Sequence, residues 1–114
     1  MASIPALSII SVVELEGGVV ADPALASLRR RLLDRMVLQF PVLDFDDGCA
    51  AAYRRIVEAI GFSRPRVIHR MIAATALAHR LSVVTANPRD FGDIPGLELE
   101  IWPSPIPPPP EAMS

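Results

Sequence analysis

The sequence predicts an α/β fold with a mainly parallel sheet. Segments with helical periodicity alternate along the chain with short apolar or β-branched runs, and this order produces parallel strands joined by helices. The chain has 114 residues, of which 51% are hydrophobic. One domain with a real core is therefore expected, and a wholly disordered chain is not.

The first strand and helix are expected at the start of the chain. Residues 6–10 form a short apolar run of strand length. Ser11 and Glu14 then match the capping box, in which a serine caps a helix and a glutamate three residues later reaches back. A short helix is therefore expected from Ser11, weakened at Gly17 and Gly18.

A second helix is expected after Asp22. Asp22 suits the N-cap, and Pro23 suits the first helical position. Apolar residues at helical spacing mark the side expected to be buried: Leu25, Leu28, Leu32 and Met36. The arginines of the same segment are expected on a solvated face: Arg29, Arg30, Arg31 and Arg35.

Residues 41–60 predict a strand followed by a helix. The strand is the run PVLDF at 41–45, and Asp46 or Asp47 caps a helix that continues to about Ile60. Gly61 fits the position just after a helix, where glycine is favoured. The residues expected to face inward are Ala50, Tyr53, Ile56, Val57 and Ile60.

Residues 66–91 are the most informative segment. Residues 70–81 have helical spacing and residues 82–85 form a β-branched strand, which Asn87 and Pro88 then end. Asp90 follows in the loop. Because ligands of α/β sheets bind outside the carboxyl ends of strands, Asn87 and Asp90 mark the candidate site. A last strand is expected at 97–102.

Charge and cysteine content narrow the possible functions. The net charge of −2 argues against strong nonspecific binding to nucleic acid, although Arg64, Arg66 and Arg70 lie close enough to the candidate site to meet phosphates. A single cysteine, Cys49, excludes a disulfide framework or a zinc site made of cysteines. It fits a reducing cytoplasm and is expected to be packed in the core. No apolar run reaches the length of a membrane span, and the first residues make a poor signal peptide.

Three stretches together resemble the PIN-domain ribonucleases, and most closely the VapC toxins of VapBC toxin–antitoxin modules. They are SIISVVEL at 8–15 with Gly18, IAATALAH at 72–79 with its following strand, and TANPRDF at 85–91 with IPGL at 94–97. The resemblance covers residues 6–102. It implies a three-layer α/β/α domain over residues 1–102, followed by a Pro-rich flexible tail at 103–114.

The resemblance also implies a chemistry. PIN ribonucleases cleave RNA with a divalent cation, Mg²⁺ or Mn²⁺, held by a cluster of carboxylates. Glu14 matches the second acid of the family, and Asn87 stands where some members have the fourth acid. Asp90 lies just beyond it and is expected to contribute through water. Mg²⁺ prefers oxygen ligands, and it lowers the pKa of a bound water.

The sequence departs from the family pattern at two places, and both concern the metal. The family begins with a strand that ends in a D-T-[NS] motif, whose Asp is a principal ligand, and this chain is expected to lack that strand. The family also has an Asp three residues before the I-A-A triplet, where this chain has His69. Imidazole is a poor ligand for Mg²⁺ and a better one for Mn²⁺ or zinc.

Each candidate residue also has a structural interpretation. Glu14 is explained by the capping box, Asp90 by a cap on the next turn, and His69 by a solvated helix start. We therefore expect a VapC-like toxin whose RNA cleavage is impaired, with Glu14, Asp90 and Asn87 as catalytic residues and Glu14, Asp90 and His69 as metal ligands. The alternative is an inactive toxin paralogue that binds an antitoxin or dimerises. The expected partners are a VapB-type antitoxin, a second copy of the chain and, if the site is active, RNA.

Overall fold

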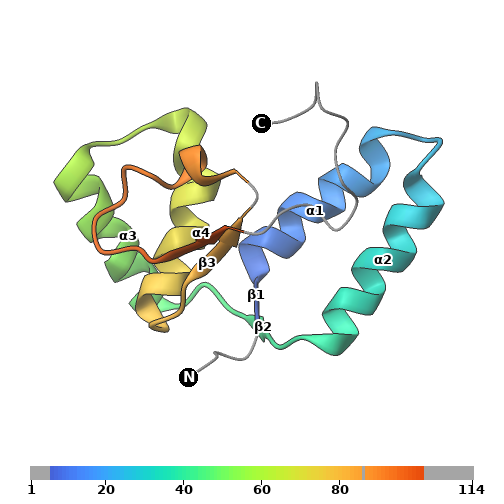
Figure 1. Cartoon of the computed structure of the whole chain (residues 1–114), viewed down its shortest axis with the longest axis horizontal. Helices are drawn as coiled ribbons and strands as arrows, with labels where there is room; N and C mark the ends of the chain where they lie inside the picture. Colours follow the sequence, from blue (N-terminus) through green and yellow to red (C-terminus); the bar gives the residue numbers. More distant parts are fainter. Residues whose placement is uncertain (1–5, 86, 102–114) are drawn as a thin grey trace.

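The computed structural model describes residues 6–85 and 87–101, and it confirms the α/β class. The elements are β1 (Leu7–Ser8), α1 (Ile9–Ala21), α2 (Ala26–Gln39), β2 (Val42–Leu43), α3 (Asp47–Ile60), α4 (Val67–Ala78), β3 (Val83–Thr85) and β4 (Leu99–Ile101). Short 3₁₀ turns lie at Arg64–Arg66 and Pro88–Asp90. The α1–α2 hairpin lies on one side of the molecule and α3, α4, β3 and β4 on the other (Figure 1). The boundary at residue 102 and the tail at 103–114 lie outside the described residues.

The strands pair in parallel, as expected, but as two separate pairs. Leu7 lies opposite Val42 in the β1–β2 pair, and Val83 lies opposite Leu99 in the β3–β4 pair. Within residues 6–85 and 87–101, no hydrogen-bonded pairing joins the two pairs. One edge of β1 and one edge of β3 therefore have no strand partner in the described structure. None of the helices described is long and apolar enough to cross a membrane.

Helix α1 starts earlier than the capping-box interpretation placed it. The N-cap is Ser8, whose Oγ accepts a hydrogen bond from the Ile10 N–H at 3.0 Å. Ser11 therefore lies inside the helix, and the expected Ser11–Glu14 box is wrong. The helix also continues through Gly17 and Gly18 to Ala21.

Helix α2 starts later than expected and exposes the side expected to be buried. Asp22 caps the short turn at residues 23–25, before α2, where its Oδ1 accepts a hydrogen bond from the Ala24 N–H at 3.0 Å. Leu28 and Leu32 are 48% and 49% exposed, whereas Leu33 is buried. The expected stripe is wrong because, among the described residues, α2 packs mainly on α1, which leaves these leucines exposed.

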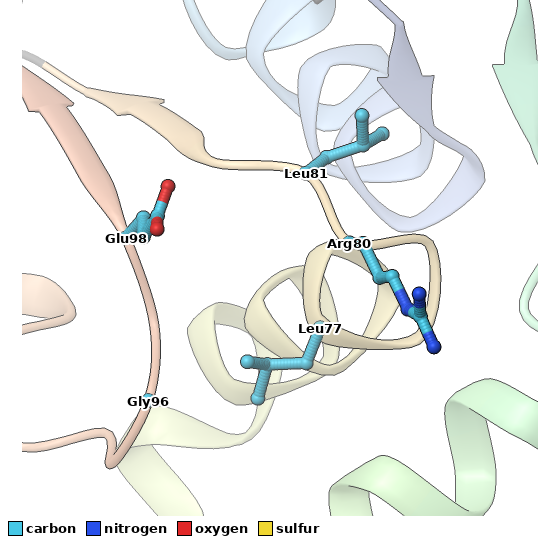
Figure 2. Close-up of a pocket in the computed structure, with 5 residues that line it drawn as sticks. All are labelled: Leu77, Arg80, Leu81, Gly96 and Glu98. Carbon is cyan, nitrogen blue, oxygen red and sulfur yellow. The ribbon is translucent and has the colours of Figure 1, made fainter.

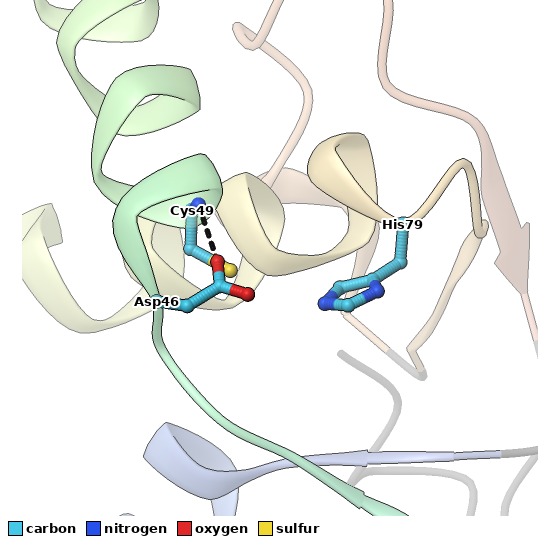
Figure 3. A group of neighbouring side chains, drawn as sticks. All are labelled: Asp46, Cys49 and His79. Carbon is cyan, nitrogen blue, oxygen red and sulfur yellow. Dashed lines mark hydrogen bonds between the residues drawn. The ribbon is translucent and has the colours of Figure 1, made fainter.

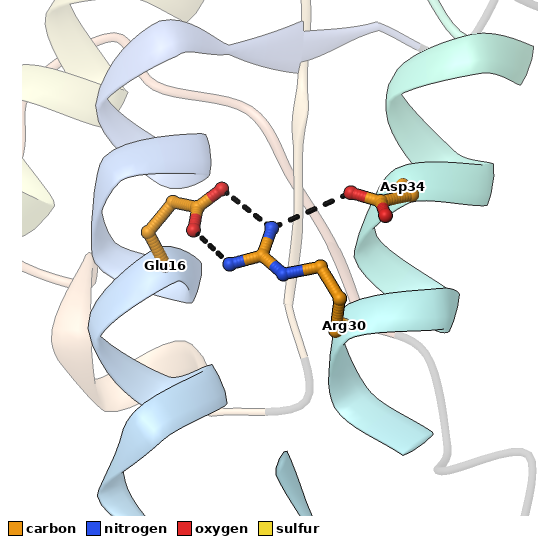
Figure 4. A network of polar contacts seen from close by, with 3 residues as sticks. All are labelled: Glu16, Arg30 and Asp34. Atoms are coloured by element: carbon orange, nitrogen blue, oxygen red, sulfur yellow. Dashed lines mark hydrogen bonds and ion pairs between the residues drawn. The ribbon is translucent and has the colours of Figure 1, made fainter. Parts of the chain in front are cut away.

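Two arginines of α2 join it to α1, so the expected solvated arginine face is only partly correct. Arg29 donates to the Gly18 carbonyl oxygen at 2.9 Å. Arg30 makes a two-pronged ion pair with Glu16 and a longer contact with Asp34 (Figure 4). The hydrogen bonds that Arg30 donates to Glu16 lower the pKa of the Glu16 carboxyl. The hydrogen bonds that Arg30 donates to Glu16 and Asp34 raise the pKa of the Arg30 guanidinium. All three side chains are substantially exposed, so water screens this network.

The core lies between α3, α4 and the β3–β4 pair. Asp46 is the N-cap of α3, with Oδ1 accepting from the Cys49 N–H at 3.0 Å, and Gly61 ends the helix with φ of +84°, both as expected. Ala50 faces solvent, contrary to expectation, since Cys49 and Ala52 hold the inward positions. The buried cluster is Ala52, Ile56, Ala73, Ala74, Ala76, Val83, Phe91 and Ile94. Its small residues allow α3 and α4 to pack closely.

Candidate functional site

Two of the four expected site residues face each other at the start of α4. His69 lies on the first turn of α4, and Asp90 lies on the 3₁₀ turn after β3. The His69 Nε2 and Asp90 Oδ2 atoms are 3.5 Å apart, and each side chain is about one-third exposed, at 31% and 35%. The Phe91 ring packs edge-on against the imidazole, with ring centroids 5.4 Å apart. The pair lies at the carboxyl end of β3, where the sequence placed the site.

A tight turn after β3 positions Asp90. The Asn87 N–H donates to Thr85 Oγ1 at 2.9 Å, and the Asp90 N–H donates to the Asn87 carbonyl oxygen at 3.2 Å. Phe91 is buried and anchors the turn in the core. Asn87 thus supports the site through its backbone, while the residue itself is exposed.

A buried arginine holds the same loop against α4. Arg70 is only 4% exposed. Its NH1 group donates to the Gly61 carbonyl oxygen at 2.6 Å, and its NH2 group lies 3.3 Å from Asp93 Oδ2. Arg66 adds a second, more exposed pair with Asp93 at 3.6 Å. The interpretation of Arg70 as a phosphate contact is therefore wrong, because its guanidinium is buried and already paired.

Asp93 is a loop anchor that the sequence did not predict. It follows Asp90 by three residues and has no helical or strand periodicity to mark it. The available signal was Arg70, because an arginine on the apolar side of a predicted helix requires an acid or carbonyl partner.

Glu14 does not join His69 and Asp90. It lies on the exposed surface of α1, and within the described residues its carboxylate has no hydrogen-bond or ion-pair partner. Among the same residues, one group of three or more His, Cys, Asp or Glu side chains could hold an ion, and it consists of Asp46, Cys49 and His79. The His69–Asp90 pair offers one carboxylate and one imidazole, which does not fit the all-oxygen shell that Mg²⁺ requires.

A shallow pocket lies at the other end of α4. Its volume is about 260 Å³, and it is lined by Leu77, Arg80, Leu81, Gly96 and Glu98 (Figure 2). These residues precede β3 and β4 and therefore lie at the amino ends of the strands. Because ligands of α/β sheets bind at the carboxyl ends, the His69–Asp90 pair remains the better candidate site.

Comparison with known proteins supports the resemblance over nearly the whole fold. The family model described as "PIN domain" matches residues 2–97. The solved structure of VapBC2 from Rickettsia felis, bound to a DNA fragment from their promoter, aligns with 28% identity and a TM-score of 0.74, covering 87% of this chain and 75% of that one. DNA-bound VapBC from Salmonella typhimurium aligns with 29% identity and a TM-score of 0.73, covering 85% and 74%.

A third solved structure agrees with these two. VapBC-5 from Mycobacterium tuberculosis, a member of the VapBC family of toxin–antitoxin systems, aligns with 26% identity and a TM-score of 0.68, covering 84% of this chain and 79% of that one. No curated protein matches the sequence at a significant level. Over most of its length, the fold of this chain therefore corresponds to that of proteins from VapBC toxin–antitoxin systems.

Proposed function

Because this chain belongs to the PIN-domain family, we propose that it is the VapC-like toxin component of a type II toxin–antitoxin module, derived from a metal-dependent endoribonuclease and impaired in RNA cleavage. The similarity to three VapBC proteins at 26–29% identity supports the toxin assignment. The His69–Asp90 pair supports the impairment. In this proposal, Glu14 and Asp90 are the remaining acids, Asn87 supports them, and His69 replaces an acid.

The observation that carries the impairment is the 3.5 Å contact between His69 and Asp90, beside which residues 6–85 and 87–101 place no second carboxylate. Mg²⁺ keeps most of its hydration shell and leaves water only for concentrated negative charge. A single partly exposed carboxylate supplies little of that charge. We therefore infer a PIN active site at this position that lacks part of its ligand set.

We expect the purified chain to show no saturable Mg²⁺ binding by isothermal titration calorimetry. His69→Asp should introduce weak binding, since it sets a second carboxylate against Asp90. Combining it with an added N-terminal strand that ends in Asp should strengthen binding by more than the sum of the separate changes, because residues of one site act together.

Ser27→Asp is the matched control, since it adds a carboxylate on the exposed surface of α2, one turn from Arg30 and Arg31. It should not introduce Mg²⁺ binding at the His69–Asp90 pair. Tight, stoichiometric Mg²⁺ binding by the unmodified chain would contradict the proposed impairment.

The alternative function, an interaction module without cleavage, has its own structural support. Large apolar side chains are exposed along the α1–α2 hairpin: Val13, Leu15, Val20, Leu25, Leu28, Leu32, Val37 and Leu38. Large apolar side chains exposed on one helical hairpin are candidates for an interaction site, because soluble proteins rarely leave large apolar patches uncovered. We propose that this hairpin contacts a VapB-type antitoxin or a second copy of the chain.

Leu28→Glu combined with Leu32→Glu should weaken self-association or antitoxin binding by at least about tenfold, because it places two unpaired charges in an apolar contact. Light scattering after size-exclusion chromatography measures the mass, and co-purification with a VapB-type antitoxin measures binding. Ser27→Glu, on the exposed surface of the same helix, is the control and should change neither. A wild-type chain that is monomeric and does not bind the antitoxin would refute this assignment of the hairpin.

A further inference from the structure

A second set of ligand-type side chains lies far from the His69–Asp90 pair. Asp46, Cys49 and His79 each offer one ligand atom, and these atoms all lie within 4.8 Å of one another (Figure 3). The two histidines are ten residues apart on or beside α4, which corresponds to about 15 Å along a helix axis. This group, the Asp46–Cys49–His79 cluster, is thus distinct from the PIN site.

Helix ends bring the three residues together. Asp46 is the N-cap of α3, and Cys49 lies on its first turn. His79 ends α4, where the Leu81 N–H donates to the Ala76 carbonyl oxygen at 2.8 Å and the Arg80 N–H donates to that of Leu77 at 3.3 Å. This pair of bonds is the Schellman motif, which fixes the backbone at His79. The beginning of α3 therefore lies beside the end of α4.

The orientation of the side chains suits one shared ion. Asp46 uses Oδ1 to cap Cys49, and its other oxygen points toward the imidazole of His79 (Figure 3). The hydrogen bond from the Cys49 N–H lowers the pKa of Asp46, which keeps the carboxylate charged. The charge of His79 also lowers the pKa of Asp46, and no hydrogen bond to the imidazole is found among the described residues, so its nitrogens are open to a metal.

The buried thiol supplies the third ligand. Cys49 is 0% exposed, and its Sγ donates a weak hydrogen bond to the Asp44 carbonyl oxygen at 3.6 Å. Asp46 and His79 are both exposed and lie on the solvent side of the sulfur. A metal that enters between them would displace the thiol proton to solvent and complete the set.

The ligand types select the metal. Thiolate, imidazole and carboxylate are the ligands of zinc, at about 2.3 Å for sulfur and about 2.0–2.2 Å for nitrogen and oxygen. Tetrahedral bonds of these lengths separate the ligand atoms by roughly 3.3–3.7 Å, whereas in the cluster these atoms lie within 4.8 Å of one another. A rotamer change of the exposed His79 supplies that movement. A soft thiolate does not favour Mg²⁺ or Ca²⁺.

We propose that Asp46, Cys49 and His79 bind one zinc ion, with water as the fourth ligand. The ion joins the start of α3 to the end of α4, the two helices that build most of the core. This link between the two helix ends does not depend on whether the PIN site cleaves RNA.

Cobalt titration of the tag-free, full-length chain tests the proposal, because Co²⁺ reports its ligands by absorption. The wild-type chain should bind one equivalent, with a thiolate-to-cobalt charge-transfer band and visible bands of tetrahedral intensity, and zinc should displace it. Zinc should also raise the melting temperature of the wild-type chain.

Variants assign the ligands. Cys49→Ser should remove the charge-transfer band, and His79→Gln should weaken binding by at least about tenfold, because loss of even supporting groups at metal sites costs about 10–100-fold. His79 is exposed, so His79→Gln keeps the fold even if the buried Cys49→Ser does not. His69→Gln, which alters the other histidine, should leave the spectrum unchanged. A wild-type chain without the band, or binding that His79→Gln leaves intact, would overturn the proposal.

Discussion

Replacing Arg70 with alanine is expected to lower the free energy of unfolding by about 2–3 kcal/mol. Arg70 is buried, and it connects the end of α3, through the Gly61 carbonyl, to Asp93 in the loop after β3. Hydrogen bonds made by a charged group contribute about 1.5–3 kcal/mol. The truncation also removes the packed stem of the side chain. The expected loss in free energy of unfolding stays within this range because Asp93 is 41% exposed, so water partly stabilises its carboxylate once it is unpaired.

Urea denaturation of a matched set measures this effect. Arg66→Ala removes the more exposed partner of the same Asp93 and should cost less than about 1 kcal/mol, as surface ion pairs do. Arg70→Met keeps much of the packing without the charge and should fall between the two. A loss below about 0.5 kcal/mol for Arg70→Ala would show that Arg70 does not hold the loop.

Arg70→Ala should also loosen the loop that carries Asp90 of the candidate site. The loop that Arg70 holds also carries Asp90, which faces His69. Backbone hydrogen bonds within the turn are local, so Arg70 and the buried Phe91 supply its long-range anchoring.

Local sequence signals predicted the elements whose ends are determined by nearby residues. Asp46 caps α3 through Cys49, three residues away, and Gly61 ends the helix in a conformation that favours glycine. The rule that sites form at the carboxyl ends of strands pointed to Asp90, the family resemblance pointed to His69, and the two side chains face each other. The predicted start of α1 was wrong because Ser8 and Ser11 both suit an N-cap, and Ser8 forms it.

Long-range packing explains the remaining errors. Periodicity showed that Leu28 and Leu32 share a helix face, but it cannot show whether another element covers that face. The Arg70–Asp93 pair joins residues 23 positions apart. The Asp46–Cys49–His79 cluster depends on how α3 and α4 pack, because a D-x-x-C spacing alone is a weak signal and His79 lies far along the chain.

RNA cleavage is the second large effect expected. The His69–Asp90 pair has one carboxylate, and Glu14 does not join it. This site has too little negative charge to hold Mg²⁺ beside the scissile phosphate. The ion would otherwise activate water and neutralise charge on the phosphate. The loss of one preorganised electrostatic group costs about 10²–10³ in rate, so the chain should cut RNA at least about 10³-fold more slowly than a version with His69→Asp and an added N-terminal strand ending in Asp.

The experiment that decides whether this PIN domain has lost its nuclease function is therefore an RNA cleavage assay with Mg²⁺, repeated with EDTA and with Glu14→Gln. We expect the wild-type chain to release no more product than either control, whereas the repaired version cuts in an EDTA-sensitive way. Robust cleavage by the wild-type chain that EDTA and Glu14→Gln both abolish would contradict the proposal. It would show that another group supplies the missing charge.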